Sequence, residues 1–322
     1  MKTALSTSNS ESKKHIITEI LFTLALTAIL LFAATAVLER KVGKIKNEEF
    51  YKSGDDYDVL FFGSSHMVNG VFPVDLLKDQ GISSYNLGAH NSYMATSYWL
   101  FRSAMDTAEP KLVVVDCYAL RADYRWKRNA LLHDILDPIP VGKTKIDALN
   151  DLFSEEEMSN VAHSEDDRAT GKAEYVWDFI RYHSRWNDLS AEDIIYRSGE
   201  ELGAESRVGV TPLKKKTYPN VDMKRDETLS EKYLKRIIKE CREAGIDVLL
   251  IYLPVEGTED DYVDAKRAAK IADEYDVGFI NFLDMDIVDY ATDFYDDESH
   301  LNPTGAHKVT HYLGEYISEH YY

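Results

Sequence analysis

The sequence predicts an α/β fold of three layers, in which helices cover both faces of a five-stranded parallel sheet. Two observations support this prediction. Short runs made almost wholly of apolar residues alternate along the chain with longer stretches of helical periodicity. A length of 322 residues with 44% hydrophobic content is also ample for one large domain with an insertion, or for two domains.

The strands and helices can be assigned in chain order from these patterns. Five apolar runs are expected to form strands: Val59–Phe62, Ser83–Leu87, Lys111–Cys117, Val248–Leu253 and Val277–Phe282. Helices are expected at Tyr93–Met105, Leu229–Ala244 and Asp264–Tyr275, and again from Pro303, with Asn302 as the cap. Functional residues of such sheets gather beyond the carboxyl ends of the strands, so the residues that follow each strand are the first candidates for a site.

The N-terminal region predicts a membrane segment. Residues 1–15 are polar and are expected to form a cytoplasmic tail, and Ile16–Leu38 carries Glu19 as its one charge. A helix of that length covers the roughly 30 Å of a bilayer core. Ala34–Ala36 fits the small-x-small pattern of a signal-peptidase site, but the apolar run is longer than an ordinary signal peptide has, which favours a retained transmembrane anchor. Basic residues flank both ends of the run, so the positive-inside rule does not decide its orientation.

The rest of the chain divides into a linker and one domain. Residues 39–56 are predicted to be a charged linker, and residues 57–322 a domain with an insertion at about 120–228. We interpret the insertion as a helical cap over the carboxyl edge of the sheet. Within it, Tyr182–Trp186 either lines a substrate cleft or belongs to the core of the cap.

Charge and cysteine content exclude several classes of protein. The formal net charge of −19 argues against non-specific binding to nucleic acid. Neither Cys117 nor Cys241 lies in a cluster of metal-binding spacing, so no structural zinc is indicated. Cys117 ends an expected strand and Cys241 lies in an expected helix, which favours two packed thiols over a disulfide. No cofactor is implied.

Two short blocks carry the candidate chemistry. Gly63–His66 follows the first strand, and taken alone this turn could simply cap the next helix. Asp297–His300 stands just before the last helix. A serine hydroxyl that attacks an acyl group needs a neutral imidazole as base, and the imidazole needs a carboxylate that holds its tautomer. We therefore predict Ser65 as nucleophile, His300 as base and Asp297 as the carboxylate that orients it.

These two blocks resemble those of the SGNH/GDSL hydrolases, whose serine follows the first strand in a Gly-x-Ser motif and whose Asp-x-x-His pair precedes the last helix. The resemblance covers roughly residues 57–120 and 228–320 and implies a flavodoxin-like sheet. It also implies that backbone N–H groups of Ser65 and Gly88 stabilise the oxyanion. The family's Gly-x-Asn-Asp block after the third strand is absent, so Asn91 and Asn86 are our candidates for a third donor.

Other features resemble the membrane-anchored branch of this family: Ser64 in place of the usual aspartate, the N-terminal anchor and the large insertion. That branch includes the D-alanyl-lipoteichoic acid biosynthesis protein and the polysaccharide O-acetyltransferases of bacterial envelopes. The resemblance implies an extracytoplasmic esterase or acyltransferase. It would act on O-acyl groups, O-acetyl in particular, of an envelope polysaccharide or a polymer like teichoic acid, with a membrane-bound acyltransferase as a partner.

Two functions of other classes stay open on the sequence. One is a non-catalytic accessory protein that binds a glycan or a membrane-bound acyltransferase, and the missing asparagine block supports it. The other is a metal-dependent hydrolase that uses Asp297, His300, His66 and His90, although their spacing is not compact. The role of His66 beside the nucleophile is not assigned by either pattern.

Overall fold

The chain forms two compact units in the computed structural model, which describes residues 4–41, 44–53, 56–160, 171–191, 193 and 201–322. One unit comprises Met1–Val42 and Ala173–Tyr196, and the other Gly43–Lys172 and Arg197–Tyr322. The larger unit holds the sheet and both sequence blocks that carry the candidate chemistry.

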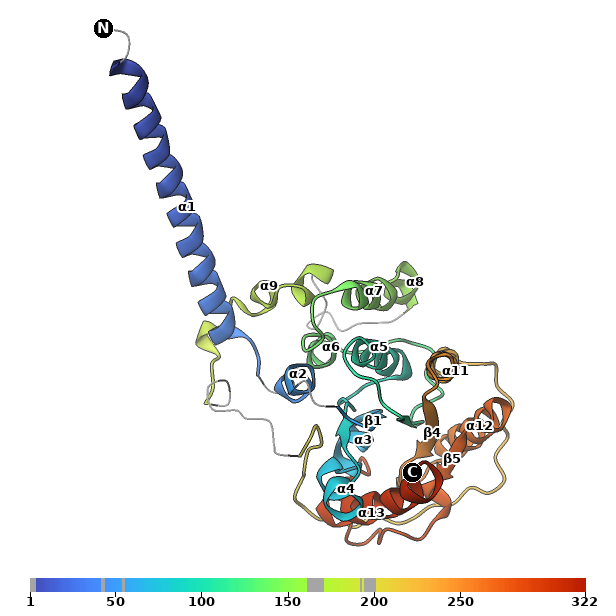
Figure 1. Cartoon of the computed structure of the whole chain (residues 1–322). Coiled ribbons are helices and arrows are strands. Elements are labelled where there is room, and N and C mark those ends of the chain that lie inside the picture. Colours follow the sequence, from blue (N-terminus) through green and yellow to red (C-terminus); the bar gives the residue numbers. More distant parts are fainter. Residues whose placement is uncertain (1–3, 42–43, 54–55, 161–170, 192, 194–200) are drawn as a thin grey trace. The chain divides into compact units, whose positions relative to one another are not determined.

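The sheet of the larger unit is parallel and has the strand order β2-β1-β3-β4-β5 (Figure 1). Its strands are β1 Val59–Phe62, β2 Ser84–Asn86, β3 Leu112–Asp116, β4 Asp247–Tyr252 and β5 Gly278–Asn281. This order is that of flavodoxin-like, doubly wound sheets, in which the connection reverses direction between β1 and β3. The predicted fold class and the five predicted strands are confirmed, and the strand bounds differ by only a few residues.

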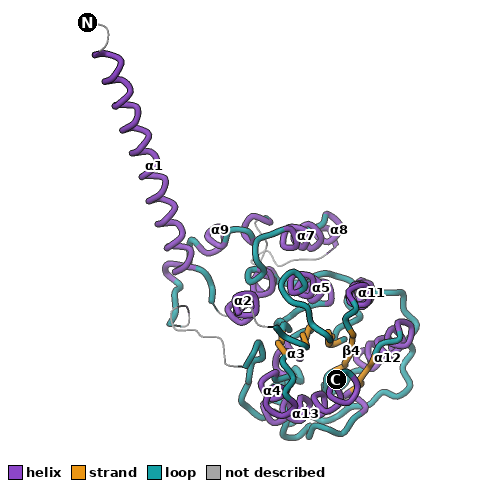
Figure 2. Tube along the Cα trace, viewed as in Figure 1, coloured by secondary structure: helices purple, strands orange, loops and turns teal. Residues whose placement is uncertain are grey.

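Helices cover both faces of this sheet, α5 and α11 on one and α4 and α13 on the other (Figures 1 and 2). The helical elements of the unit are α2 Lys44–Ser53, α3 Ser65–Gly70, α4 Pro73–Gln80, α5 Met94–Ala104, α6 Asn129–Leu136, α7 Lys143–Leu152, α8 Glu155–Asn160, α11 Leu229–Ala244, α12 Glu259–Tyr275, η4 Phe282–Asp284 and α13 Pro303–His320. The predicted three-layer arrangement is therefore confirmed.

Alternate residues of the central strands face opposite helix layers, and both sets are buried. Val59, Phe61 and Val114 belong to a hydrophobic cluster that also contains residues of α4 and α13. Phe62 points the other way and meets Phe101 of α5, with ring centroids 5.9 Å apart. Because both faces are covered, neither face needs polar side chains, which explains the unbroken apolar runs in the sequence.

Helix ends follow local capping rules. The predicted bounds of α11 are confirmed. The helix α12 begins earlier than its predicted start at Asp264, because Thr258 and Asp261 form a capping box that stabilises an additional turn. The last helix starts as predicted: Pro303 is its first residue, and the Asn302 side chain accepts a hydrogen bond from the Gly305 N–H at 3.2 Å. This cap fixes the chain immediately after His300.

Both cysteines are buried and free, so the prediction of two packed thiols is confirmed. Burial raises the pKa of the Cys241 thiol to about 12. A thiol with that pKa is protonated at neutral pH and is a poor nucleophile.

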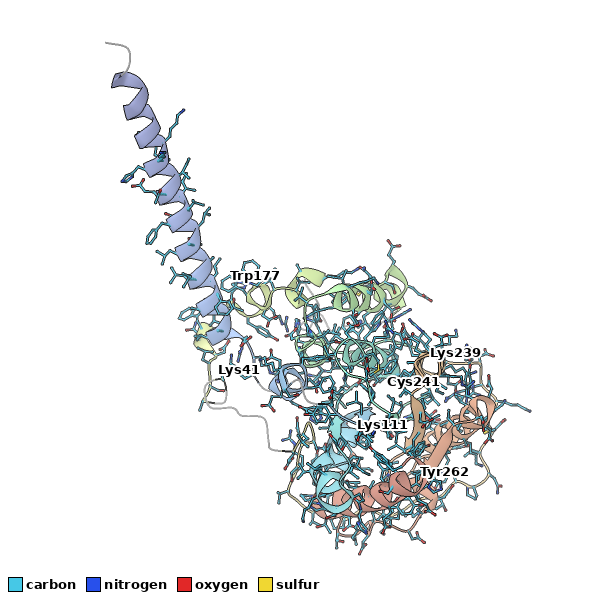
Figure 3. All side chains as sticks on the ribbon, in the orientation of Figure 1. Lys41, Lys111, Trp177, Lys239, Cys241 and Tyr262 are labelled. Atoms are coloured by element: carbon cyan, nitrogen blue, oxygen red, sulfur yellow. The ribbon has the colours of Figure 1, made fainter. Side chains whose placement is uncertain are left out.

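The smaller unit consists of α1 Ala4–Leu38 and the short elements η2 Lys172–Tyr175, α9 Asp178–Tyr182 and η3 Arg185–Asn187. By length and composition Ser12–Leu38 could cross a membrane, although a signal sequence would have the same properties. Side chains project outward along α1 (Figure 3). The helix starts at Ala4, so most of the predicted N-terminal tail continues it, and α2 lies in the predicted linker.

Within the predicted insertion, residues 173–191 group with α1 in the smaller unit. Tyr182–Trp186 belongs to this smaller unit. The reason is local: Arg185 donates a hydrogen bond to the carbonyl oxygen of Leu38 at 2.8 Å, which ties η3 to the end of α1. Other parts of the insertion remain with the sheet.

Candidate active site

The turn after β1 delivers Ser65 to the carboxyl edge of the sheet. Ser64 caps α3, because its side chain accepts a hydrogen bond from the N–H of His66 at 3.3 Å, and Ser65 is the first residue of that helix. The turn is tight: a Cβ on Gly63 would lie 2.8 Å from the Cβ of Asp116 and 3.0 Å from that of Met67. Only glycine fits this position, and the sharp turn leaves the Ser65 hydroxyl at the surface of a cavity.

A short loop before α13 holds His300. The loop is closed by an antiparallel bridge between Phe294 and Leu301, and the N–H of Tyr295 donates to the carbonyl of His300 at 3.0 Å. Ser299 adopts the left-handed conformation, with φ of 66°, which reverses the chain just before the histidine. His300 is thereby fixed on a rigid support.

The His300 imidazole bridges a serine and a carboxylate. Its Nε2 lies 2.7 Å from the Ser65 Oγ, and its Nδ1 lies 2.7 Å from Oδ2 of Asp296. The other carboxylate oxygen of Asp296 accepts a hydrogen bond from the backbone N–H of His300 at 3.1 Å. The carboxylate thus holds both the ring and the backbone of the histidine, with Nδ1–H as donor and Nε2 as acceptor for the serine hydroxyl.

The prediction that Asp297 orients the histidine is wrong, since the carboxylate in contact with His300 is that of Asp296. The left-handed turn at Ser299 brings the residue four positions before the histidine, not three, back to its ring. Asp297 lines the same cavity without taking this position. The adjacent pair Asp296–Asp297 was visible in the sequence, but spacing alone could not decide between its members.

Two of the predicted oxyanion donors are used inside the fold. The Asn86 side-chain amide donates to the carbonyls of Met67 and Val71 at 2.8 and 2.9 Å, and its Oδ1 accepts from the N–H of Gly88 at 2.9 Å. Asn86 is fully buried. These bonds join the end of β2 to α3, so the predictions that Asn86 and Gly88 donate to an oxyanion are wrong.

Asn91 is the predicted donor that does line the cavity. It has a φ of 55°, and its Oδ1 accepts a hydrogen bond from the Tyr93 hydroxyl at 3.4 Å, which leaves its Nδ2 as a donor group at the cavity wall. The backbone N–H of Ser65 is the second candidate, because the first N–H groups of a helix have no acceptor within the helix.

Asp116 ends β3, and its side chain lies next to the turn at Gly63. In the SGNH/GDSL pattern, the Gly-x-Asn-Asp block would follow this strand. Burial raises the pKa of Asp116 to about 7, and its Oδ1 accepts a hydrogen bond from the Leu253 N–H at 3.4 Å. It supports the turn from below and is not among the described residues that line the cavity. A role as oxyanion donor is not indicated.

The cavity in front of Ser65 has a volume of about 950 Å³ and is lined by aromatic and charged side chains. Its tyrosines are Tyr93, Tyr118, Tyr124 and Tyr295, and its basic residues are Arg121, Lys127, Arg128 and Arg207. Several of these lie in the predicted insertion at about 120–228. Lys127 lies 4.6 Å from the ring centroid of Tyr124. Tyrosine rings and nearby cations suit a polyhydroxylated or anionic ligand.

His66 packs beside His300, a contact that the sequence did not reveal. Its ring stacks on that of His300 with centroids 4.6 Å apart, and its Nε2 lies 3.2 Å from the carbonyl oxygen of Glu298. Burial lowers the pKa of His66 to about 3, and the neighbouring His300 adds to this effect. His66 is therefore neutral at physiological pH and adds no positive charge next to His300.

The predicted metal ligands do not come together as one group. His90 pairs with Glu205 at 3.0 Å, and His66 faces a backbone carbonyl. Among the described residues, the groups close enough to share an ion are Asp296, Glu298 and His300, with ligand atoms within 4.8 Å of one another. A metal at that place would compete with the hydrogen bonds that His300 makes to Asp296 and Ser65.

Comparisons with known proteins give weak similarities. No family model and no curated protein matches the sequence. Among solved structures, a candidate acylhydrolase from Bacteroides fragilis is 12% identical with a TM-score of 0.42, over 87% of this chain and 99% of that chain. A GDSL-like lipase from Bacteroides thetaiotaomicron is 12% identical with a TM-score of 0.40, over 83% of this chain and 90% of that chain. A candidate platelet activating factor from Streptococcus pneumoniae is 13% identical with a TM-score of 0.40, over 91% and 99%. At TM-scores of this size, function is inferred from the site residues alone.

The low pKa of His66 predicts a pH dependence of stability. The unfolded chain binds a proton at this histidine below a pH of about 6.5, whereas the folded chain does not until about 3. The free energy of unfolding should therefore fall as the pH drops through this window, by up to about 1.4 kcal/mol per pH unit from His66. In His66→Gln this contribution is lost. Urea denaturation at a series of pH values should show a shallower slope for the variant, and equal slopes would contradict a buried neutral His66.

Proposed function

We propose that this chain is a serine esterase or acyltransferase of the SGNH/GDSL type that forms an acyl-enzyme on Ser65. The observation that carries this proposal is the continuous chain of hydrogen bonds from Ser65 through His300 to Asp296, with both distances 2.7 Å. A serine whose hydroxyl faces the acceptor nitrogen of an imidazole, which a carboxylate holds in turn, has the constellation that acyl transfer requires.

The reaction follows from this geometry. The Ser65 Oγ attacks the carbonyl carbon of an ester while its proton passes to Nε2 of His300, and Asp296 stabilises the imidazolium that forms. The imidazolium then protonates the leaving alcohol, and the ester bond breaks to leave an acyl-serine. In the second half, His300 takes a proton from water or a sugar hydroxyl, whose oxygen attacks the acyl-serine. The acyl–Oγ bond then breaks, and the imidazolium returns the proton to the Ser65 Oγ. The acceptor decides between hydrolysis and transfer.

The developing negative charge on the carbonyl oxygen needs donors, and we assign these to the backbone N–H of Ser65 and the Nδ2 of Asn91. Asn91 lines the cavity that contains Ser65, and the side-chain amide is a donor of the type found in oxyanion sites. This set has no contribution from Gly88, because its N–H is bonded to Asn86.

As substrate we propose O-acyl groups, O-acetyl in particular, on an envelope glycopolymer, either a polysaccharide or a polymer like teichoic acid. The tyrosines and basic residues of the cavity support a sugar or phosphate-containing chain. We further propose that α1 is a single-pass anchor with the larger unit outside the cytoplasm, and that a membrane-bound acyltransferase supplies or receives the acyl group. Anchoring raises the effective concentration of the enzyme near a surface polymer.

A second candidate is a non-catalytic protein that uses the same cavity to bind a glycan or an acyltransferase. The specific observation in its favour is that Asn86 and Gly88 are occupied with each other, which reduces the number of oxyanion donors. The two functions differ in whether Ser65 reacts.

Labelling by a fluorophosphonate probe tests the proposal directly. The wild-type chain should be labelled on Ser65, and Ser65→Ala should lose the label and at least about 10³-fold of its activity on p-nitrophenyl acetate. Ser64→Ala is the matched control, because it removes the neighbouring hydroxyl and a helix cap but not the nucleophile. An unlabelled wild-type chain would favour the binding protein over the enzyme.

Substitutions of the neighbouring residues Asp296 and Asp297 should differ in their effect on the catalytic rate. Asp296→Asn should lower kcat by about 10²- to 10⁴-fold, because the amide favours the wrong tautomer of His300 and cannot stabilise its charged form. Asp297→Asn should stay within about twofold of wild type, since its side chain is not the partner of His300. Steady-state kinetics on p-nitrophenyl acetate measures both, and the reverse order would return the orienting role to Asp297.

Substitution of Asn91 should lower the catalytic rate, whereas substitution of Asn86 should lower the stability of the fold. Asn91→Gly, chosen because glycine tolerates the positive φ, should lower kcat by about 10²-fold with little change in KM. Asn86→Ala should instead lower the free energy of unfolding by about 2–3 kcal/mol, because buried carbonyls of Met67 and Val71 lose their donor. Kinetics and urea denaturation of both variants check this, and an Asn91→Gly variant with wild-type kcat would remove Asn91 from the oxyanion site.

A further inference from the structure

The smaller unit joins two segments that lie far apart in the sequence. Residues 173–191, which we call the α9 segment, pack with α1 (Figure 1). The contact is made where α1 ends: Arg185 donates to the carbonyl oxygen of Leu38, the last residue of the helix, at 2.8 Å. The same guanidinium pairs with Asp193 at 2.9 and 3.0 Å, which holds it in place. The α9 segment is therefore attached to the end of α1 by an arginine that is itself held by an ion pair.

The α9 segment exposes large apolar side chains that a water-soluble surface would not favour. The chain has four tryptophans. Trp99 and Trp126 of the larger unit are 8% and 2% exposed, whereas Trp177 and Trp186 of the α9 segment are 46% and 68% exposed. Figure 3 labels Trp177, which lies on the stretch that packs with α1. Val176, Ile180 and Leu189 are exposed in the same short segment. This density of exposed apolar side chains needs a partner.

The position of the α9 segment along α1 indicates which kind of partner covers it. The apolar stretch Ser12–Leu38, whose outward side chains fit a hydrocarbon environment, ends at the residue that Arg185 holds. If this stretch spans a bilayer, its last residue lies where hydrocarbon gives way to headgroups. Tryptophan prefers that zone, because its ring is apolar and its indole N–H can bond to water or headgroups. Lys41 donates back to the Ala36 carbonyl, as a basic side chain near a membrane boundary does.

We propose that the α9 segment is a second membrane contact, which lies in the headgroup region of the bilayer beside the end of α1 and inserts Trp177 and Trp186 there. The occupant of this apolar face is a lipid surface, continuous with the lipid around α1. The contact requires that α1 remain part of the mature protein, because cleavage after Ala36 would remove the helix on which the segment packs. The proposal does not depend on the chemistry of Ser65.

Tryptophan quenching in vesicles tests this proposal on the full-length chain. The protein is reconstituted in phosphatidylcholine–phosphatidylglycerol vesicles whose acyl chains carry bromine either near the headgroups or near the chain ends. Wild type is compared with Trp177→Phe, Trp186→Phe and the double variant. Subtracting the double variant from wild type isolates the emission of the two tryptophans from that of Trp99 and Trp126. Circular dichroism shows whether the variants retain the fold.

The difference emission should fall by about twofold with bromine near the headgroups and by less with bromine near the chain ends, because a ring at the membrane interface lies close to the shallow bromines. Iodide in the aqueous phase should quench it little. Three results would overturn the proposal. Quenching by iodide and not by bromine would place the segment in water. Resistance to both quenchers would mean that a second copy or another protein covers it. Stronger quenching by the deep bromines would place it within the hydrocarbon core.

Discussion

The site depends on one imidazole that joins two distant parts of the chain. His300 accepts from Ser65 through one ring nitrogen and donates to Asp296 through the other, and neither contact survives if the ring moves by even an ångström. The ring is held by the cap of α13 on one side and by the bridge-closed loop on the other. The parallel sheet supplies the remaining constraint, because it brings the end of β1 and the start of α13 to the same edge.

Much of the fold could be predicted from sequence, because the central strands are buried on both faces and helices such as α11 and α13 carry their own N-terminal side-chain caps. The run Val59–Phe62 and the Asn302–Pro303 start show this well: the strand is apolar at every position, and the helix cap depends on nearby residues alone. Ser65 and His300 could be found for the same reason: each stands directly after or before such an element. The partner of His300 could not, since the choice between Asp296 and Asp297 rests on a left-handed residue that no propensity indicates.

The other misses arise from tertiary contacts. Asn86 looks like a free polar side chain at a strand end, but the backbone of α3 lies close enough to take its amide, and Gly88 completes the arrangement. Similarly, the aromatic stretch around Trp186 could fill a cap or line a cleft. It packs on α1 instead, and Arg185 donates a hydrogen bond to Leu38, a residue far away in the sequence. In both cases the residue types were evident from the sequence, but the distant residues that they contact were not.

The loop that carries His300 is among the last parts of the chain to be synthesised. Asp296 and His300 lie in one loop closed by the bridge between Phe294 and Leu301, so this pair needs only residues close in sequence. Ser65 follows the first strand, as the first residue of α3, and leaves the ribosome long before them. During most of its synthesis the chain therefore carries a serine without a base. The proposed reaction of Ser65 with an ester therefore becomes possible only when the final helix is complete and docked.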